Sequence, residues 1–149
     1  MTEIRFYHLQ KQSLDQALPL ILEKAYKTDY RSLVIMKDAL ESERISALLW
    51  SYKPNAFLPH GSKKDGKAKL QPIWFSDNDE NVNEANALIL TQGQITDTVG
   101  NYDLVCEMLN GHSDQEITDA RIRWKTYQAA GHDITYWFQN ENGGWTKKA

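Results

Sequence analysis

The stretch Ser32-Leu-Val-Ile-Met36 indicates the fold class of this chain more directly than any other. Its four successive apolar side chains are typical of a strand that is covered on both faces, because a strand with a solvent-facing side alternates apolar and polar residues. A second run of this kind, Ala87-Leu-Ile-Leu90, follows later in the chain. Strands of this type occur almost only in parallel sheets that carry helices on both sides, so the two runs predict an α/β domain.

Three segments carry a helix-start signal followed by apolar residues at helical spacing. In each, a serine or aspartate precedes a glutamine or glutamate by three residues, so that the side chains can cap the first amide groups. The three pairs are Ser13 and Gln16, Asp38 and Glu41, and Ser113 and Glu116. The third helix is expected to run to about residue 130, where Gly131 ends it. Pro19 interrupts the first helical pattern, because proline past the first turn kinks or breaks a helix.

The remaining strands are shorter or mixed in polarity. The first alternates, with Ile4, Phe6 and His8 expected on one face. These strands are predicted at residues 3–8, 72–75 and 104–109, and a long irregular connection at 51–69. Strands that alternate with helices predict a single layered α/β domain over residues 1–149 with a mostly parallel central sheet. Many unrelated functions share such an architecture, so it names none of them.

The composition is that of an ordinary globular domain. Of the 149 residues 41% are hydrophobic and 25% charged, and the formal net charge of −3 gives no global attraction to nucleic acid. Cys106, the single cysteine, cannot form an internal disulfide, and its apolar neighbours favour a buried structural thiol. The N-terminal residues lack the apolar core of a signal peptide, and no stretch approaches the ~20 apolar residues of a membrane span. We expect a cytoplasmic protein without membrane association.

The segment from Gly61 to Ala68 nearly matches the phosphate-binding P-loop. That mechanism needs a strand before the loop, a helix after it, and a hydroxyl after the lysine to hold Mg²⁺. Here Ala68 follows Lys67, Pro59 precedes the loop, and a strand is expected after it. The segment is therefore interpreted as a flexible basic loop without bound nucleotide.

Other polar clusters also lack the arrangement that catalysis or metal binding requires. Asp77-Asn-Asp79 begins like a calcium-binding loop, but Val82 stands where that loop needs its turn glycine. His60, near Ser62, has no orienting carboxylate and is expected to pack against the adjacent turn. The four histidines, at positions 8, 60, 112 and 132, do not have the spacing of metal ligands. We expect no catalytic residue, no metal site and no cofactor.

Basic and aromatic residues occur together on the last predicted helix. Arg121 and Lys125 are four residues apart and therefore share a face, and Trp124 lies beside Arg121 at a spacing of three. A cationic surface next to an aromatic ring suits a short peptide with an acidic stretch and an apolar or carboxylate end. The alternative is a solvated helix edge beside a core tryptophan.

A second aromatic group surrounds a proline-rich loop. Trp50, Tyr52 and Phe57 lie close in sequence around Pro54 and Pro59. Exposed aromatic side chains on such loops mark protein interfaces. The alternative is that the rings fasten the loop to the core of the domain.

These segments together resemble the chi subunit of bacterial DNA polymerase III. No single motif is diagnostic, but the set is collinear over almost the whole chain. The matching segments are Phe6-Tyr-His-Leu9, Leu49-Trp-Ser-Tyr-Lys-Pro-Asn-Ala-Phe-Leu-Pro-His60, Pro72-Ile-Trp74 and Ala120-Arg-Ile-Arg-Trp-Lys-Thr-Tyr-Gln-Ala-Ala-Gly131. The resemblance implies a three-layer, Rossmann-like fold without nucleotide and an accessory role in the clamp-loader part of the replicase, without catalysis.

The resemblance also implies partners and their sites. The acidic, Pro-Phe-ending tail of single-stranded DNA-binding protein (SSB) would bind at Arg121, Trp124 and Lys125. The psi subunit, or a repair helicase that competes with it in some bacteria, would bind at Trp50 and Phe57, and DNA would be reached only indirectly. Trp124 stands where tyrosine is common in the family, and Gln128 replaces a basic residue found in some members, so the pocket shape and local charge differ.

Three functional classes follow from the sequence. The first is a protein-interaction module of the replicase. The second is a nucleotide-dependent enzyme that uses the 61–68 loop, which the missing hydroxyl disfavours. The third is a direct binder of single-stranded nucleic acid through Trp145 and the C-terminal lysines, which the negative net charge disfavours.

Overall fold

The computed structural model describes residues 2–51 and 58–149. In this part of the chain, eight strands form one sheet in the order β3-β4-β2-β5-β6-β1-β7-β8. All neighbouring pairs are parallel except β7 and β8. The strands are β1 (Glu3–Leu9), β2 (Ser32–Ile35), β3 (Gly61–Ser62), β4 (Ile73–Ser76), β5 (Ala87–Leu90), β6 (Leu104–Asn110), β7 (Asp133–Gln139) and β8 (Trp145–Lys147). The predicted mostly parallel sheet is confirmed.

The two continuous apolar runs lie side by side in the sheet. Ser32 of β2 pairs with Ala87 of β5, and every residue of both strands is buried. Both faces of these strands are covered, which is why their sequences carry no polar alternation.

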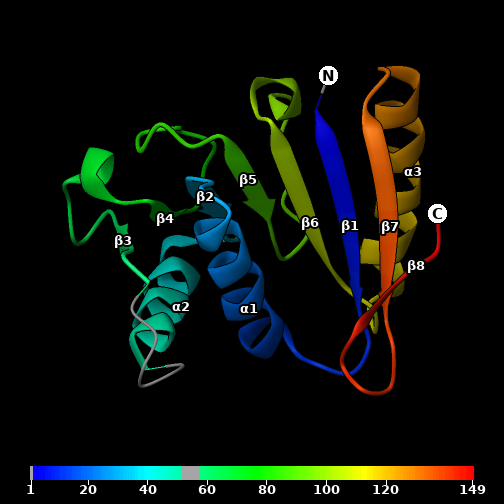
Figure 1. Cartoon of the computed structure of the whole chain (residues 1–149), viewed down its shortest axis with the longest axis horizontal. Helices are drawn as coiled ribbons and strands as arrows, with labels where there is room; N and C mark the ends of the chain where they lie inside the picture. Colours follow the sequence, from blue (N-terminus) through cyan, green and yellow to red (C-terminus); the bar gives the residue numbers. More distant parts are fainter. Residues whose placement is uncertain (1, 52–57) are drawn as a thin grey trace.

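Three helices in the described residues cover the two faces of the sheet: α1 (Leu14–Lys27), α2 (Ala39–Ser51) and α3 (Asp114–Ala129). Figure 1 shows α1 and α2 on one side and α3 on the other, beside β7. The core is divided accordingly: Tyr7 and Leu9 of β1 pack on the α1–α2 side, and Ile4 and Phe6 on the α3 side. The predicted three layers and the alternation of β1 are confirmed. No helix in the described residues is long and apolar enough to cross a membrane.

The helix starts follow the predicted caps. Ser13 and Gln16 form a complete capping box, and the Asp38 carboxylate accepts from the Glu41 amide at 2.8 Å. The Ser113 hydroxyl accepts from the Glu116 amide, whereas the Glu116 side chain accepts from Asn110 instead of completing a box. The proline in α1 removes one backbone hydrogen bond without ending the helix, since the apolar residues around it are buried.

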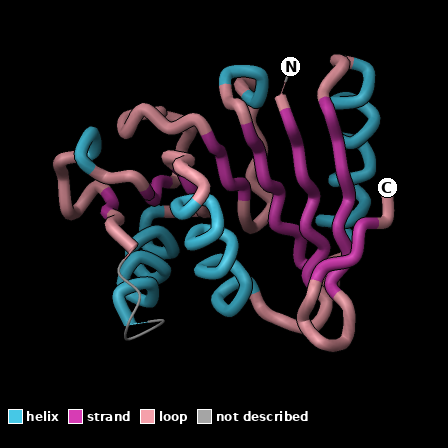
Figure 2. The backbone as a smooth tube through the Cα atoms, in the orientation of Figure 1, coloured by secondary structure: helices cyan, strands magenta, loops and turns pink. Residues whose placement is uncertain are grey.

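The region between α2 and β5 contains structure that the sequence pattern did not indicate. Residues 51–69 were expected to be irregular throughout, yet Gly61–Ser62 pair with Trp74–Phe75 as β3, and Ala68–Leu70 form a short 3₁₀ helix. Figure 2 shows that, apart from β4, the other described residues of this region are mostly loop. A strand of two residues carries no readable periodicity, which explains why it was missed.

One charged residue lies in the middle of the core. Glu107 of β6 is 1% exposed, and its carboxylate accepts from Arg123 at 2.6 Å and from the Tyr127 hydroxyl at 2.6 Å. Both partners belong to α3, so this group ties the helix to the sheet. Burial, with the Glu107 charge adding to it, raises the pKa of Tyr127.

We predict that Arg123→Ala destabilises the protein by about 3 kcal/mol, because it leaves the Glu107 carboxylate buried with only one of its two partners. Arg121→Ala on the same helix is the matched control and should change stability by less than about 0.5 kcal/mol, since Arg121 is exposed. Urea unfolding of both variants measures the difference. Equal stabilities would show that the buried pair does not hold α3.

Candidate functional site

Arg121 and Lys125 lie on the outer surface of α3. Both are exposed, and neither forms an ion pair with any other described residue. Trp124 between them is partly buried, with its ring 5.6 Å from that of Phe6 and 6.1 Å from that of Tyr136. The structure therefore brings the three predicted residues together on α3, and we call them the α3 ledge.

The orientation of α3 explains why Arg121 and Lys125 are exposed and unpaired. Arg123 faces inward to Glu107, and residues two positions away on a helix are about 200° apart, so Arg121 and Lys125 face outward. Trp124 packs against the core on the α3 side and stays partly exposed. The tryptophan thus contacts the core and its basic neighbours are solvated, as the alternative of a solvated helix edge beside a core tryptophan expects, and peptide binding at these residues stays a prediction.

A polar chain beside the ledge was not found from the sequence. His8 on β1 is buried, with Nδ1 2.6 Å from the Tyr136 hydroxyl and Nε2 2.7 Å from the Gln10 amide nitrogen. The strand pattern placed His8 on the face of Phe6 but gave no sign of Tyr136, which is 128 residues away. The register of β1 against β7 brings the two together.

Trp50 lies at the C-terminal end of α2, far along the sheet from α3. Its side chain is 53% exposed, and its ring centroid is 4.0 Å from that of His60. His60 is buried, and its ring nitrogens lie 2.7 and 2.8 Å from the carbonyl oxygens of Leu58 and Ser46. The histidine thus fastens the chain after the loop to α2. Phe57, predicted beside Trp50 in the same interface, lies outside the described residues.

The near-P-loop has a different geometry from a phosphate site. It begins in the two-residue strand β3 and ends in a single 3₁₀ turn. The Ser62 hydroxyl lies 2.5 Å from a Glu43 carboxylate oxygen and 3.2 Å from an Asp65 oxygen. Two carboxylates next to the loop oppose the approach of a phosphate.

The acidic turn that begins at Asp77 has a structural role. The Asp79 carboxylate accepts from the hydroxyls of Thr96, Thr98 and Tyr102, which ties this turn to the chain before β6. Among the described residues, no group of three or more His, Cys, Asp or Glu side chains is placed to hold a metal ion. Trp145, considered for nucleic-acid stacking, packs on Tyr7 with ring centroids 4.9 Å apart.

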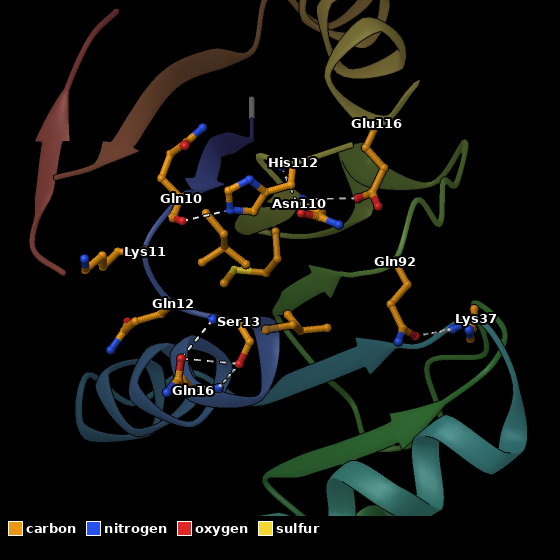
Figure 3. Close-up of a pocket in the computed structure, with 13 residues that line it drawn as sticks. Gln10, Lys11, Gln12, Ser13, Gln16, Lys37, Gln92, Asn110, His112 and Glu116 are labelled. Carbon is orange, nitrogen blue, oxygen red and sulfur yellow. Dashed lines mark hydrogen bonds between the residues drawn. The ribbon is translucent and has the colours of Figure 1, made fainter. Parts of the chain in front are cut away.

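A crevice of about 670 Å³ opens at the carboxyl ends of β1 and β6 (Figure 3). Lys11, Lys37 and His112 line it together with Glu116 and several amide side chains. α1 follows β1 on one face, and α3 follows β6 on the other, so this is the switch point where α/β folds often bind ligands. Its lining comes from four separate stretches of the chain, which explains why no local motif indicated it.

The sequence model of one family, described as "DNA polymerase III chi subunit, HolC", matches residues 1–135. The chain belongs to this family. A "Probable DNA polymerase III subunit chi" from Rickettsia prowazekii (strain Madrid E) is 31% identical over 90 residues, which cover 60% of this chain. The matched residues span about half of the relative, 54% of its length.

Membership of the chi family confirms the resemblance seen in the sequence. Chi is a non-catalytic accessory subunit of DNA polymerase III, which agrees with the expectation that this chain is not an enzyme. The α3 ledge falls within the residues that match the chi family. The roles of Arg121, Trp124, Lys125 and Trp50 in this chi-family protein stay predictions.

We predict that Trp50→Ala in this chi-family protein costs less than about 1.5 kcal/mol of stability, because half of its side chain is already in solvent. Trp74→Ala is the matched control and should cost about 3–5 kcal/mol, since Trp74 is 6% exposed within the core on the α3 side. Thermal unfolding of both variants measures the difference. A loss at position 50 as large as at position 74 would make Trp50 a core residue.

Proposed function

We propose that this chi-family protein connects the clamp-loader part of DNA polymerase III to SSB by binding the acidic C-terminal tail of SSB at the α3 ledge. The observation that supports the proposal is the pair of exposed cations, Arg121 and Lys125, next to the partly exposed Trp124 on the same helix. Most other arginines in the described chain are paired with acidic neighbours, so Arg121 stands out by its unpaired charge.

The chemistry of the tail matches this surface. A guanidinium group binds a carboxylate in a two-bond fork, and an ammonium group adds a second, less directional charge. An indole ring offers an apolar surface for the Pro-Phe end of such a tail. The acidic stretch and the aromatic end are therefore both served by residues within two turns of one helix.

We further propose that Trp50, with Phe57, forms the second interface, for a psi subunit or for a repair helicase. A tryptophan with half of its surface in solvent is a typical interface anchor. In this proposal the protein acts in the cytoplasm and reaches DNA only through SSB. Its net charge of −3 supports this, because a direct binder would need a basic surface.

Arg121→Ala should weaken binding of a fluorescently labelled peptide with an acidic stretch ending in Pro-Phe by about 1.5–3 kcal/mol, because a charge-assisted contact is lost. Arg121→Lys should recover only part of the affinity, since lysine lacks the fork. Lys24→Ala, an exposed lysine on α1, is the charge control and should bind like the wild type. Fluorescence anisotropy gives the affinities.

The same titration at rising salt tests the electrostatic part of the proposal. Affinity should fall as salt screens the exposed contacts of Arg121 and Lys125. A salt-independent affinity would mean that the tail is held by apolar contacts near Trp124, and an unchanged affinity in Arg121→Ala would remove the assignment.

Trp50→Ala should abolish capture of a purified psi subunit or repair helicase while peptide binding at the α3 ledge stays at the wild-type level. The reason is that an anchor residue at one interface contributes nothing to a separate one. Surface-immobilised variants can be tested against both ligands. Loss of both interactions together would show that the two surfaces are not separate.

A further inference from the structure

The C-terminal hairpin extends the α3 ledge along the edge of the sheet. Along β7, Ile134 and Tyr136 pack on the α3 side of the core, and strand alternation places Phe138 on that face as well. The family match ends at residue 135, so Tyr136 and all of β8 lie beyond it. These residues are partly exposed where α3 does not cover them.

The Tyr136 hydroxyl is oriented by the polar chain behind it. The Gln10 amide nitrogen, a donor, lies 2.7 Å from Nε2 of His8 and also faces the Gly111 carbonyl at 3.4 Å. Nε2 therefore accepts, and the proton of the neutral ring is on Nδ1. Nδ1 then donates to the Tyr136 oxygen at 2.6 Å.

This assignment leaves the hydroxyl hydrogen of Tyr136 free to donate. Among the described residues, His8 is the only hydrogen-bond partner of that hydroxyl. Burial, with the charges of His112 and Arg121 adding to it, lowers the pKa of His8 and keeps the ring neutral. Arg121 also acts electrostatically on Tyr136, where it opposes the rise in pKa caused by burial. The free hydroxyl donor of Tyr136 and the unpaired guanidinium group of Arg121 therefore belong to the same surface.

A further cation stands next to these groups. Lys148 Nζ lies 5.8 Å from the centre of the Phe138 ring, and the Lys148 amide donates to the Tyr136 carbonyl. Phe138 and Lys148 line a hollow of about 500 Å³, together with Lys11 and Glu141. The positive charge of the α3 ledge thus continues onto the hairpin.

We propose that the Tyr136 hydroxyl donates a hydrogen bond to a carboxylate of the acidic peptide bound at the α3 ledge, and that Lys148 supplies a third cation for it. This inference rests on the proposed function, because it assigns two additional contacts to the same ligand. Together the contacts describe a surface that runs from α3 across β7 to β8.

Tyr136→Phe removes the hydroxyl and keeps the ring that packs on Phe6 and Trp124. Its affinity for the labelled acidic peptide should fall about tenfold, the cost of one hydrogen bond to a charged group. Tyr26→Phe is the matched control, because Tyr26 is exposed on α1. It should bind like the wild type and keep the wild-type melting temperature. Tyr136→Phe should melt at a lower temperature, because the buried Nδ1–H of His8 loses its acceptor, so binding is measured well below the melting transition of both variants.

Lys148→Ala and Lys147→Ala form a second matched pair. They remove the same charge from adjacent residues, but the pairing of β7 with β8 places Lys147 beside Trp137, on the opposite face. Lys148→Ala should weaken binding about threefold and Lys147→Ala should not, since an exposed contact is worth little and a distant charge less. Equal losses of affinity in the two variants would mean that Lys148 contributes only a general electrostatic attraction for the peptide.

His8 acts through Tyr136 as a positioning residue. His8→Leu should weaken binding about twofold in the wild-type background and have no further effect in the Tyr136→Phe background, because the hydroxyl it orients is then absent. Additive losses in the two backgrounds would show that His8 only supports the fold.

The outcomes distinguish the contacts of Tyr136 and Lys148 from the proposed peptide binding at the α3 ledge. If the wild type does not bind the acidic peptide, both fail. If Arg121→Ala loses binding while Tyr136→Phe and Lys148→Ala keep it, the proposed function stands and the extension is overturned. If all three lose binding and both controls keep it, the extended surface is supported. Peptides with a C-terminal amide, or with asparagine for aspartate, then identify which carboxylate Tyr136 contacts: the terminal group or a side chain.

Discussion

The arrangement of the α3 ledge depends on the buried Glu107 carboxylate. This group lies in a central strand, and Arg123 and Tyr127 of α3 are the side chains that neutralise and hydrogen-bond it. Turning α3 about its axis would leave a charge unpaired in the core, at a cost of several kcal/mol. The helix is thereby fixed with Arg121 and Lys125 facing outward. A buried ion pair of this kind adds little net stability, but it fixes the orientation of the helix that carries the α3 ledge.

Much of this structure follows from local sequence patterns. The apolar runs at 32–36 and 87–90 predicted a doubly covered parallel sheet, and helix spacing placed Arg121, Trp124 and Lys125 together. These features depend on periodicity within a few residues, which a single sequence displays.

Other features depend on contacts between distant segments, and the sequence does not display them. Glu107 sits within an apolar run whose pattern gives no indication of Arg123, and His8 meets Tyr136 only because β1 pairs with β7. The crevice at the carboxyl ends of β1 and β6 likewise needs four separate stretches of the chain in their folded positions. Strand order and register produce these features, and a linear pattern encodes neither one directly.

The shortest strands of the described sheet stand at its two edges. β3 has two residues and β8 has three, so each edge offers few unpaired backbone groups. Long exposed edges invite another chain to add a strand, whether as a partner or as an aggregate. This protein gives such a strand little to pair with. Association through surface side chains does not need such a strand. The identity of these side chains can change from one lineage to another without altering the sheet, so recognition can diverge while the fold is retained.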